Sequence, residues 1–221
     1  MRPKESIPEQ TLRRIPHYHQ ILSDLEAQGQ KLISSSYLSR FFRVHDTQVR
    51  KDVSVIGYRG RPKAGYSVSG LRQAIADFLG INLQNTAVLV GAGKLGSALC
   101  GYSGLAEYGL RIVGVFDSDR AKIGLEVAAF TIQDIATLPQ FLAGRGVGIA
   151  ILTVPKDAAQ AAADLVVGLG IRALWSFAPT QLVVPAEVSV RHENLAVGLA
   201  LLSHDLKKSQ QAPREQPNAC S

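Results

Sequence analysis

One stretch of the chain constrains its fold more than any other: a short apolar run, TAVLV, that leads directly into the glycine-rich segment GAGKLG at residues 91–96. Three further apolar runs follow, RIVGVFDSD, VGIAILTVP and IRALWSFAP, and helix-length segments separate them. Apolar strands that alternate with helices predict a parallel sheet covered on both faces. We therefore expect an α/β domain of the doubly wound, Rossmann type over residues 81–191.

The glycines of residues 91–96 have the spacing G-x-G-x-x-G, directly after a predicted strand and at the start of a predicted helix. In that setting the first glycine makes a tight turn, the second lets the backbone approach a pyrophosphate, and the third permits close helix packing. The N-terminus of the helix also favours phosphate charge. The expected dinucleotide-binding loop consists of Gly91, Ala92, Gly93, Lys94, Leu95 and Gly96.

Asp117 lies 21 positions after Gly96, at the end of the next predicted strand. A carboxylate there can accept hydrogen bonds from an adenosine ribose and would repel a 2′-phosphate, so NAD is favoured over NADP. Arg120 and Lys122 follow closely and weaken this exclusion. The alternative is a domain whose glycines serve packing alone or bind another adenine nucleotide.

The positive charge of the chain is confined to its first part. Residues 1–80 contain 13 Lys and Arg against 7 Asp and Glu, whereas the remaining residues contain 11 of each class. A basic module beside a neutral one indicates that the basic module meets a polyanion, with nucleic acid as the leading candidate.

Residues 1–80 carry the pattern of a winged helix. An amphipathic helix is predicted over residues 8–28, and a short helix capped by one of the serines 34–36, followed by another from Asp46, gives a helix-turn-helix. The segment YRGRPKAGY suits a β-hairpin wing. A solvated charged face is the alternative to a DNA-binding surface. The expected DNA contacts, from the last helix and the wing, are Gln48, Arg50, Lys51, Ser54, Arg59, Arg61 and Lys63.

The end of the chain is predicted to form a helix over residues 192–208, whose leucines at helical spacing suit a dimer partner, followed by a disordered tail over residues 209–221. No apolar run is long enough to span a membrane, and the N-terminus lacks the apolar stretch of a signal peptide. Two cysteines, Cys100 and Cys220, cannot build a disulfide framework or a Cys-based zinc site within one chain. We expect a cytoplasmic protein without a metal site.

A nicotinamide enzyme would also need a substrate domain and a group that transfers a proton. Residues 81–221 leave little material for a substrate pocket, and their only histidines, His192 and His204, lie in or beside the terminal helix. We therefore expect no catalytic residues. A small NAD-dependent oxidoreductase, or a nucleotide-binding accessory protein that keeps a vestigial winged helix, remains the alternative.

Seven stretches between Ile7 and Leu206 are typical of one known family: IPEQTLRRIPHYHQIL, QVRKD, GAGKLGSAL, FDSD, LTVPKDAAQ, FAP and ENLAVGL. On these stretches the chain resembles the Rex family of redox-sensing transcriptional repressors. The resemblance implies a homodimer that exchanges its C-terminal helices, binds operator DNA, and is released by NADH, while NAD⁺ competes without releasing it. It also implies that the nicotinamide pocket is walled by Tyr102, Pro155, Phe177, Ala178 and Pro179.

The chain departs from the family at several positions. Gln20 and Asn194 stand where an arginine and an aspartate are common, and some members tie those two residues to the tyrosine that matches Tyr102. A contact between the neutral side chains of Gln20 and Asn194 would be weaker than one between charged side chains. We therefore expect an altered set point for the NADH/NAD⁺ ratio, or altered coupling between the two domains. In the wing, Pro62 and Lys63 replace a usual Arg-Gly pair, so the operator preference could shift.

Overall fold

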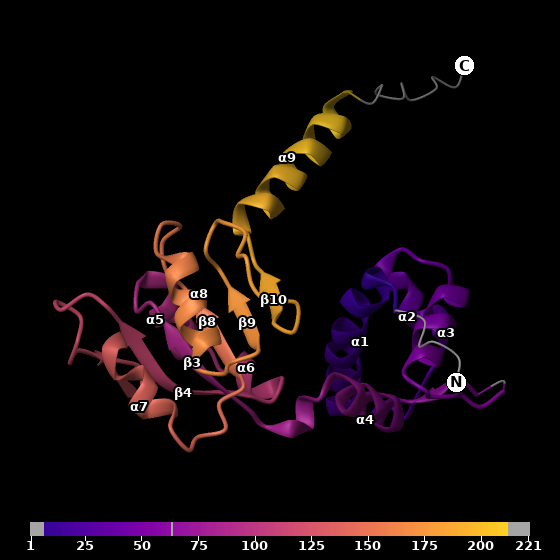
Figure 1. The fold of residues 1–221 in the computed structure, drawn as a ribbon. Coiled ribbons are helices and arrows are strands. Elements are labelled where there is room, and N and C mark those ends of the chain that lie inside the picture. The colour runs from indigo at the N-terminus through magenta and orange to yellow at the C-terminus, as the bar shows by residue number, and fades with distance from the viewer. Residues whose placement is uncertain (1–6, 63, 212–221) are drawn as a thin grey trace. The chain divides into compact units, whose positions relative to one another are not determined.

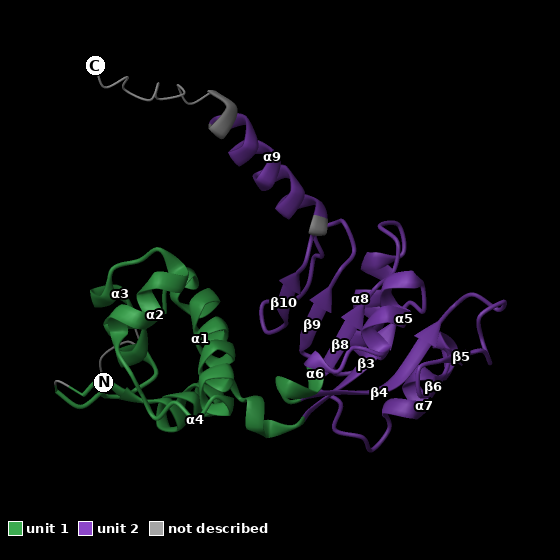
Figure 2. Ribbon diagram, turned by 180° about the vertical axis from the view of Figure 1, so that it is seen from behind, with its two compact units in different colours: residues 1–84, 105–109 green, residues 85–104, 110–221 purple. Residues whose placement is uncertain are grey.

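The computed structural model describes residues 7–62 and 64–211, which form two compact units (Figure 2). Unit 1 consists of residues 1–84 and 105–109, and unit 2 of residues 85–104 and 110–221. The boundary at residue 84 lies four positions beyond the predicted one, because a short 3₁₀ turn, Ile81–Leu83, extends the end of unit 1.

Unit 1 has the predicted winged-helix arrangement (Figure 1). Its helices are α1 (Glu9–Ala27), α2 (Ser35–Phe42), α3 (Asp46–Val55) and α4 (Val68–Leu79). Strands β1 (Leu32–Ile33) and β2 (Tyr66–Ser67) pair in antiparallel fashion. Ahead of β2, Arg61 and Gly65 form an isolated antiparallel bridge, which brings together the two sides of the predicted wing (residues 58–66).

Local signals explain where the helices of unit 1 begin and end. The Ser34 hydroxyl accepts a hydrogen bond from the Tyr37 amide at 3.1 Å and so caps α2. Arg43 adopts a left-handed conformation, with φ of 52°, and ends α2 before α3 starts at Asp46. Side chains from all four helices then bury one core, which includes Ile15, Tyr18, Leu22, Leu38, Val49, Val53, Leu71 and Ile75.

Unit 2 contains a six-stranded parallel sheet in the order β10-β9-β8-β3-β4-β7. The strands are β3 (Asn85–Val90), β4 (Leu110–Asp117), β7 (Gln133–Asp134), β8 (Ile149–Leu152), β9 (Ala173–Ser176) and β10 (Ser189–His192). The chain begins at β3 in the middle, runs to one edge, and then crosses back to build the other half from β8. This is the strand order of a Rossmann fold, as predicted.

Two edge strands were not predicted from the sequence. Strand β7 is two polar residues long, and β10 alternates exposed with half-buried residues instead of forming an apolar run. His192 therefore ends a strand and does not lie in the terminal helix, which corrects the predicted start of that helix. A strand at the edge of a sheet pairs with one neighbour only and is less buried than a central strand, so its residues need not all be apolar.

Helices cover both faces of the sheet in unit 2 (Figure 1). Val88 and Val90 pack into one core with residues of α7 (Leu138–Leu142) and α8 (Ala159–Gly168). Leu89 points to the opposite face, where it lies against Gly96 of α5 (Lys94–Cys100). Helix α6 (Gly104–Glu107) and a hairpin of β5 (Glu126–Val127) and β6 (Phe130–Thr131) complete the connections.

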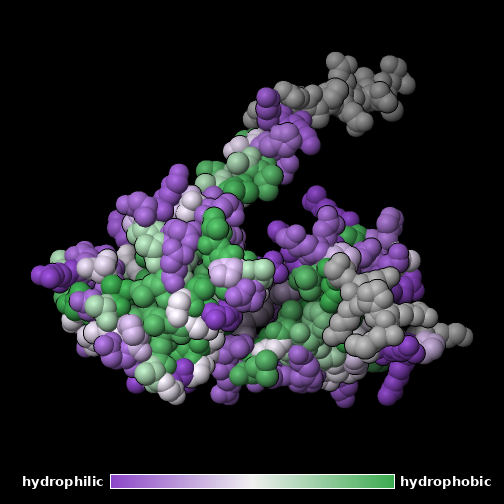
Figure 3. Space-filling view, viewed as in Figure 1, coloured by the Kyte–Doolittle hydropathy of each residue, from purple (hydrophilic) through white to green (hydrophobic). Residues whose placement is uncertain are grey.

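The last helix, α9 (Leu195–Gln211), starts three residues later than predicted and runs three residues past Lys208, into the segment predicted to be disordered. The remainder of that segment, residues 212–221, and with it Cys220, lies outside the described residues. Leucines 199, 202 and 206 are all more than half exposed, and Figure 3 shows apolar residues gathered on this helix. No helix in the described ranges is long and apolar enough to cross a membrane.

Candidate nucleotide pocket and nucleic-acid interface

A pocket of about 480 Å³ opens in unit 2 where the strand order reverses, at the carboxyl ends of β3 and β8. Gly91 and Gly93 line it from the loop after β3, and Thr153 and Pro155 line it from the loop after β8. Asp117, at the end of β4, also lines it. In open α/β sheets this crevice is the usual place for a nucleotide.

The three glycines of the loop have the geometry that the motif predicts. Gly91 has φ of +102°, and a Cβ there would meet the Thr153 carbonyl group at 2.8 Å. A Cβ on Gly96 would collide with the Gly91 carbonyl oxygen, so only glycine lets α5 approach the strand. A Cβ on Gly93 would meet no atom within 4 Å, because this side of the loop faces open space.

Two hydrogen bonds connect the glycine loop to residues at the ends of β8 and β4. The Thr153 hydroxyl donates a hydrogen bond to the Gly91 carbonyl oxygen at 2.6 Å. On the other side, the Ala92 amide donates to Asp117 Oδ2 at 2.8 Å. The loop is therefore fixed by β8 and by β4 before any ligand binds.

Asp117 is almost fully buried, and its carboxylate already has several partners. Besides the Ala92 amide, it accepts hydrogen bonds from the Asp119 amide at 2.8 Å and from Lys122 Nζ at 3.0 Å. Burial acts to raise the pKa of Asp117, but these hydrogen bonds outweigh it and lower the pKa overall. The same ion pair raises the pKa of Lys122, so both groups stay charged.

Not all of the predicted dinucleotide contacts line this pocket. Gly91, Gly93, Asp117 and Pro155 do. Ala92, Gly96 and Ala178 are buried, Phe177 is half-buried with its ring 4.8 Å from that of Trp175, and Lys94, Leu95, Tyr102 and Pro179 are exposed. All twelve residues stay predictions as ligand contacts, and four of them line the pocket.

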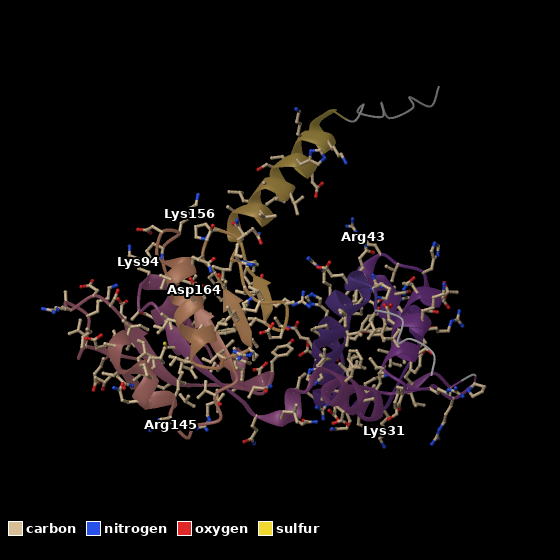
Figure 4. The ribbon with its side chains drawn as sticks, viewed as in Figure 1. Lys31, Arg43, Lys94, Arg145, Lys156 and Asp164 are labelled. Carbon is tan, nitrogen blue, oxygen red and sulfur yellow. The ribbon has the colours of Figure 1, made fainter. Side chains whose placement is uncertain are left out.

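The pocket also contains residues that sequence reasoning did not select. Thr153 follows the apolar residues of β8, and its position beside the reversal of strand order was the available signal. Lys122 was noted only as a neighbouring cation. Lys156 follows Pro155 and, like Lys94, is exposed; both lie at one edge of unit 2 in Figure 4.

In unit 1, four side chains of α3 share one exposed stripe. Thr47, Arg50, Lys51 and Ser54 lie three or four residues apart and are all exposed. Thr47 was missed, although its spacing from Arg50 and Lys51 was visible in the sequence. Gln48 is half-buried and donates a hydrogen bond from Nε2 to Asp52 Oδ1 at 3.0 Å, so it lies at the border of the stripe.

The wing meets this stripe along a groove of about 500 Å³. Arg50 and Ser54 line the groove from α3, and Arg59, Arg61 and Pro62 line it from the wing. Lys63, which was also predicted to contact DNA, lies outside the described residues. Helix α3 and the predicted wing therefore place the cationic side chains of Arg50, Arg59 and Arg61 around one groove.

Among the described residues, no group of three or more His, Cys, Asp or Glu is placed to hold a metal ion. Cys100 is half-buried in α5, and burial raises the pKa of its thiol.

Two family models match the chain: "Putative DNA-binding protein N-terminus" over residues 6–54 and "CoA binding domain" over residues 82–180. The redox-sensing transcriptional repressor Rex of Treponema denticola is 40% identical over 200 residues, which is 90% of this chain and 95% of the relative. Rex of Thermus thermophilus is 42% identical over 197 residues, which is 89% of this chain and 92% of the relative.

Solved structures of the repressor RSP match over the same extent. The structure described as RSP in complex with β-NAD⁺ and operator DNA has a TM-score of 0.87 at 33% identity, and covers 94% of this chain and 95% of its own. RSP in complex with β-NADH has a TM-score of 0.84 at 32% identity, and covers 94% and 97%. Since identity near 40% extends over nearly the whole length of this chain and of its relatives, the chain belongs to the Rex family of redox-sensing transcriptional repressors.

Proposed function

We propose that this chain is a DNA-binding transcriptional repressor that senses the ratio of NADH to NAD⁺ and leaves its operator when NADH binds. The observation that carries the proposal is the whole-length similarity to RSP, whose solved structures contain NAD⁺ with operator DNA in one case and NADH in another. The pocket after β3 and the cationic surface of α3 support it independently, because they provide one site for each ligand.

In this proposal the dinucleotide lies across the carboxyl edge of the sheet. Its pyrophosphate meets the backbone at Gly93, where open space adjoins the loop, with the Lys94 ammonium nearby. The adenosine ribose meets Asp117, and the nicotinamide meets Tyr102, Pro155 and the loop at residues 177–179. NADH and NAD⁺ differ by one charge on the nicotinamide, so apolar walls favour the neutral, reduced ring.

DNA meets α3 and the wing. The stripe of Thr47, Arg50, Lys51 and Ser54 enters the major groove, and Arg59 and Arg61 contact the backbone or the minor groove. Gln48 joins the border of this surface. Lys63 is part of the same proposed interface.

The active species in this proposal is a homodimer, and its two-fold symmetry is matched by a palindromic operator. Leu199, Leu202 and Leu206 of α9 present exposed apolar area of the kind that a partner subunit covers. Exchange of α9 between subunits would join the two dinucleotide pockets in one assembly. We also propose a cytoplasmic location, since the partner is DNA.

The alternative, a small oxidoreductase, is less well supported because the relatives are named as repressors. The test is to select an operator from random duplex DNA and to measure its binding by fluorescence anisotropy with NADH or NAD⁺. We expect NADH to release the operator at concentrations where NAD⁺ does not. Equal effects of the two dinucleotides, or none, would reject the proposal, and hydride transfer to a small substrate would favour the enzyme.

A further inference from the structure

Asp52 lies on the inner face of α3 and is only 1% exposed. Within the described part of the chain, its carboxylate accepts five side-chain hydrogen bonds. Arg14 donates two of them in a fork, from Nε at 2.7 Å and from Nη2 at 3.0 Å. Thr11 and Tyr18 each donate one at 2.9 Å, and Gln48 donates one at 3.0 Å. Three side chains of α1 therefore donate hydrogen bonds to one residue of α3.

Taking two charges out of water costs about as much as their attraction returns, so the burial of this ion pair is weak evidence for a role in stability. A forked contact between an arginine and a carboxylate, however, fixes both the distance and the angle between two groups. Helix α3 is thereby held against α1 at one rotation about its own axis.

The rotation of α3 decides where its DNA-facing stripe points. Asp52 follows Lys51 directly, at about 100° around the helix, since one turn takes 3.6 residues. The stripe of Thr47, Arg50, Lys51 and Ser54 is exposed on the side away from α1. Hydrogen bonds to base edges need side chains placed to within about 0.5 Å, whereas long cationic side chains can reach phosphates from several positions.

We propose that Asp52 is a positioning residue for operator specificity: it holds the exposed stripe of α3 in register with the base edges without touching DNA itself. This inference rests on the proposed DNA-binding function. It has a particular consequence. Loss of the Asp52 carboxylate lowers the preference for operator over unrelated DNA, while the attraction to phosphates persists, because Arg50 and Lys51 keep their charges.

The test compares Asp52→Asn with the wild type on the selected operator and on an unrelated duplex of the same length, over a series of salt concentrations. We expect the ratio of the two affinities to fall by at least about tenfold. Binding to the unrelated duplex and the slope of log affinity against log salt should stay unchanged, as should the affinity for NADH. Asp77→Asn, an exposed carboxylate of α4 that accepts from Gln73 and Asn82, is the matched control.

Tyr18→Phe provides a second variant, in case Asp52→Asn does not fold. It removes one hydrogen bond to Asp52 and keeps the ring that packs edge-on against Phe42 at 4.8 Å. We expect a smaller fall in the same ratio, about threefold. An unchanged ratio in a folded variant would overturn the inference while the proposed function stands. A wild type with no preference for any operator would instead overturn the proposed function, and this inference with it.

Discussion

Single side chains of α3 have the most direct consequences for DNA binding. Arg50 and Lys51 are exposed on the stripe, and Arg50 also lines the groove beside the wing. Replacing either by alanine should lower the slope of log affinity against log salt by about 1 for each phosphate that the variant no longer neutralises. The affinity for NADH, measured by titration of the same variants, should not change.

The control for this prediction is Arg145→Ala, an exposed arginine of unit 2 that lies over the ring of Phe141. It removes the same charge at a place where no DNA contact is proposed. If Arg50→Ala and Arg145→Ala have the same salt dependence, Arg50 does not belong to the interface.

Two glycines of the loop after β3 should respond very differently to a side chain. Gly93→Val adds atoms on the open side of the loop, so the folded protein should tolerate it while dinucleotide binding is abolished. The variant should bind operator and remain bound when NADH is added. Gly96→Ala forces its Cβ onto the Gly91 carbonyl oxygen and should lower stability by roughly 1–3 kcal/mol.

Thermal unfolding, NADH titration and operator release together check this pair. A Gly93→Val protein that is still released by NADH would move the dinucleotide to a different site. Equal melting temperatures for the wild type and Gly96→Ala would show that α5 does not depend on its close approach to the strand.

His19 of α1 should make the stability of unit 1 depend on pH. Burial, assisted by the nearby charge of Arg72, lowers its pKa from the ordinary 6.5, and its Nε2 has no hydrogen-bond partner among the described residues. The unfolded chain therefore takes up a proton that the folded unit resists. The free energy of unfolding should fall as the pH drops below about 6.5, and level off below the depressed pKa.

Denaturant unfolding between pH 7.5 and 5 measures this slope. His19→Leu should flatten it, because the group that the folded state keeps neutral is gone. His204→Gln, a change on the exposed face of α9, should leave the slope as it is. An equal slope in His19→Leu would assign the pH dependence to other groups.

The role of a single residue was predictable from the sequence where its residue type is required by one kind of local structure. The glycines of residues 91–96 were, because their spacing reflects backbone geometry that other residues cannot adopt. Asp52 and Thr153 were not, because a polar residue that serves a tertiary contact has no signature until its partner is known. For Asp52 that partner is Arg14, 38 positions away in the chain.

At the scale of helices and strands, α9 carries the sharpest prediction. Leu199 and Leu202 are each 65% exposed, and a folded chain in water rarely leaves such residues uncovered in a row. If α9 forms the interface of the proposed dimer, replacing both by glutamate should give a monomer in sedimentation and weaken operator binding. Lys207→Glu, a change of charge on the same helix, is the control and should remain a dimer. A dimeric double variant would place the interface elsewhere.

Elements were predictable from the sequence where burial imposes a pattern. Strands β3, β4 and β8 are mostly buried, and β9 alternates buried with half-buried residues; all four are apolar runs near the middle of the sheet. The edge strands β7 and β10 form because they pair with a neighbouring strand, and no pattern in their own short sequences predicts that pairing. For the same reason, the start of α9 was predicted three residues too early.

For the molecule as a whole, the charge split and the glycine motif together predicted the right architecture, because the two units have different chemical tasks. The basic unit 1 presents the surface of α3 and the wing, and the neutral unit 2 presents the pocket after β3. What the sequence alone could not provide is the coupling. Gln20 is exposed on α1, and Asn194 accepts a hydrogen bond from the Ala196 amide at 3.0 Å at the start of α9; both side chains are uncharged.

The measurement that tests the proposed redox response most directly holds the total concentration of NADH plus NAD⁺ constant and varies only their ratio. Operator occupancy is followed by fluorescence anisotropy at one salt concentration. We expect occupancy to fall steeply as the ratio rises, since a ligand shifts such an equilibrium only through its different affinities for the two states. Operator occupancy that stays the same across the whole range of ratios would contradict the proposed function.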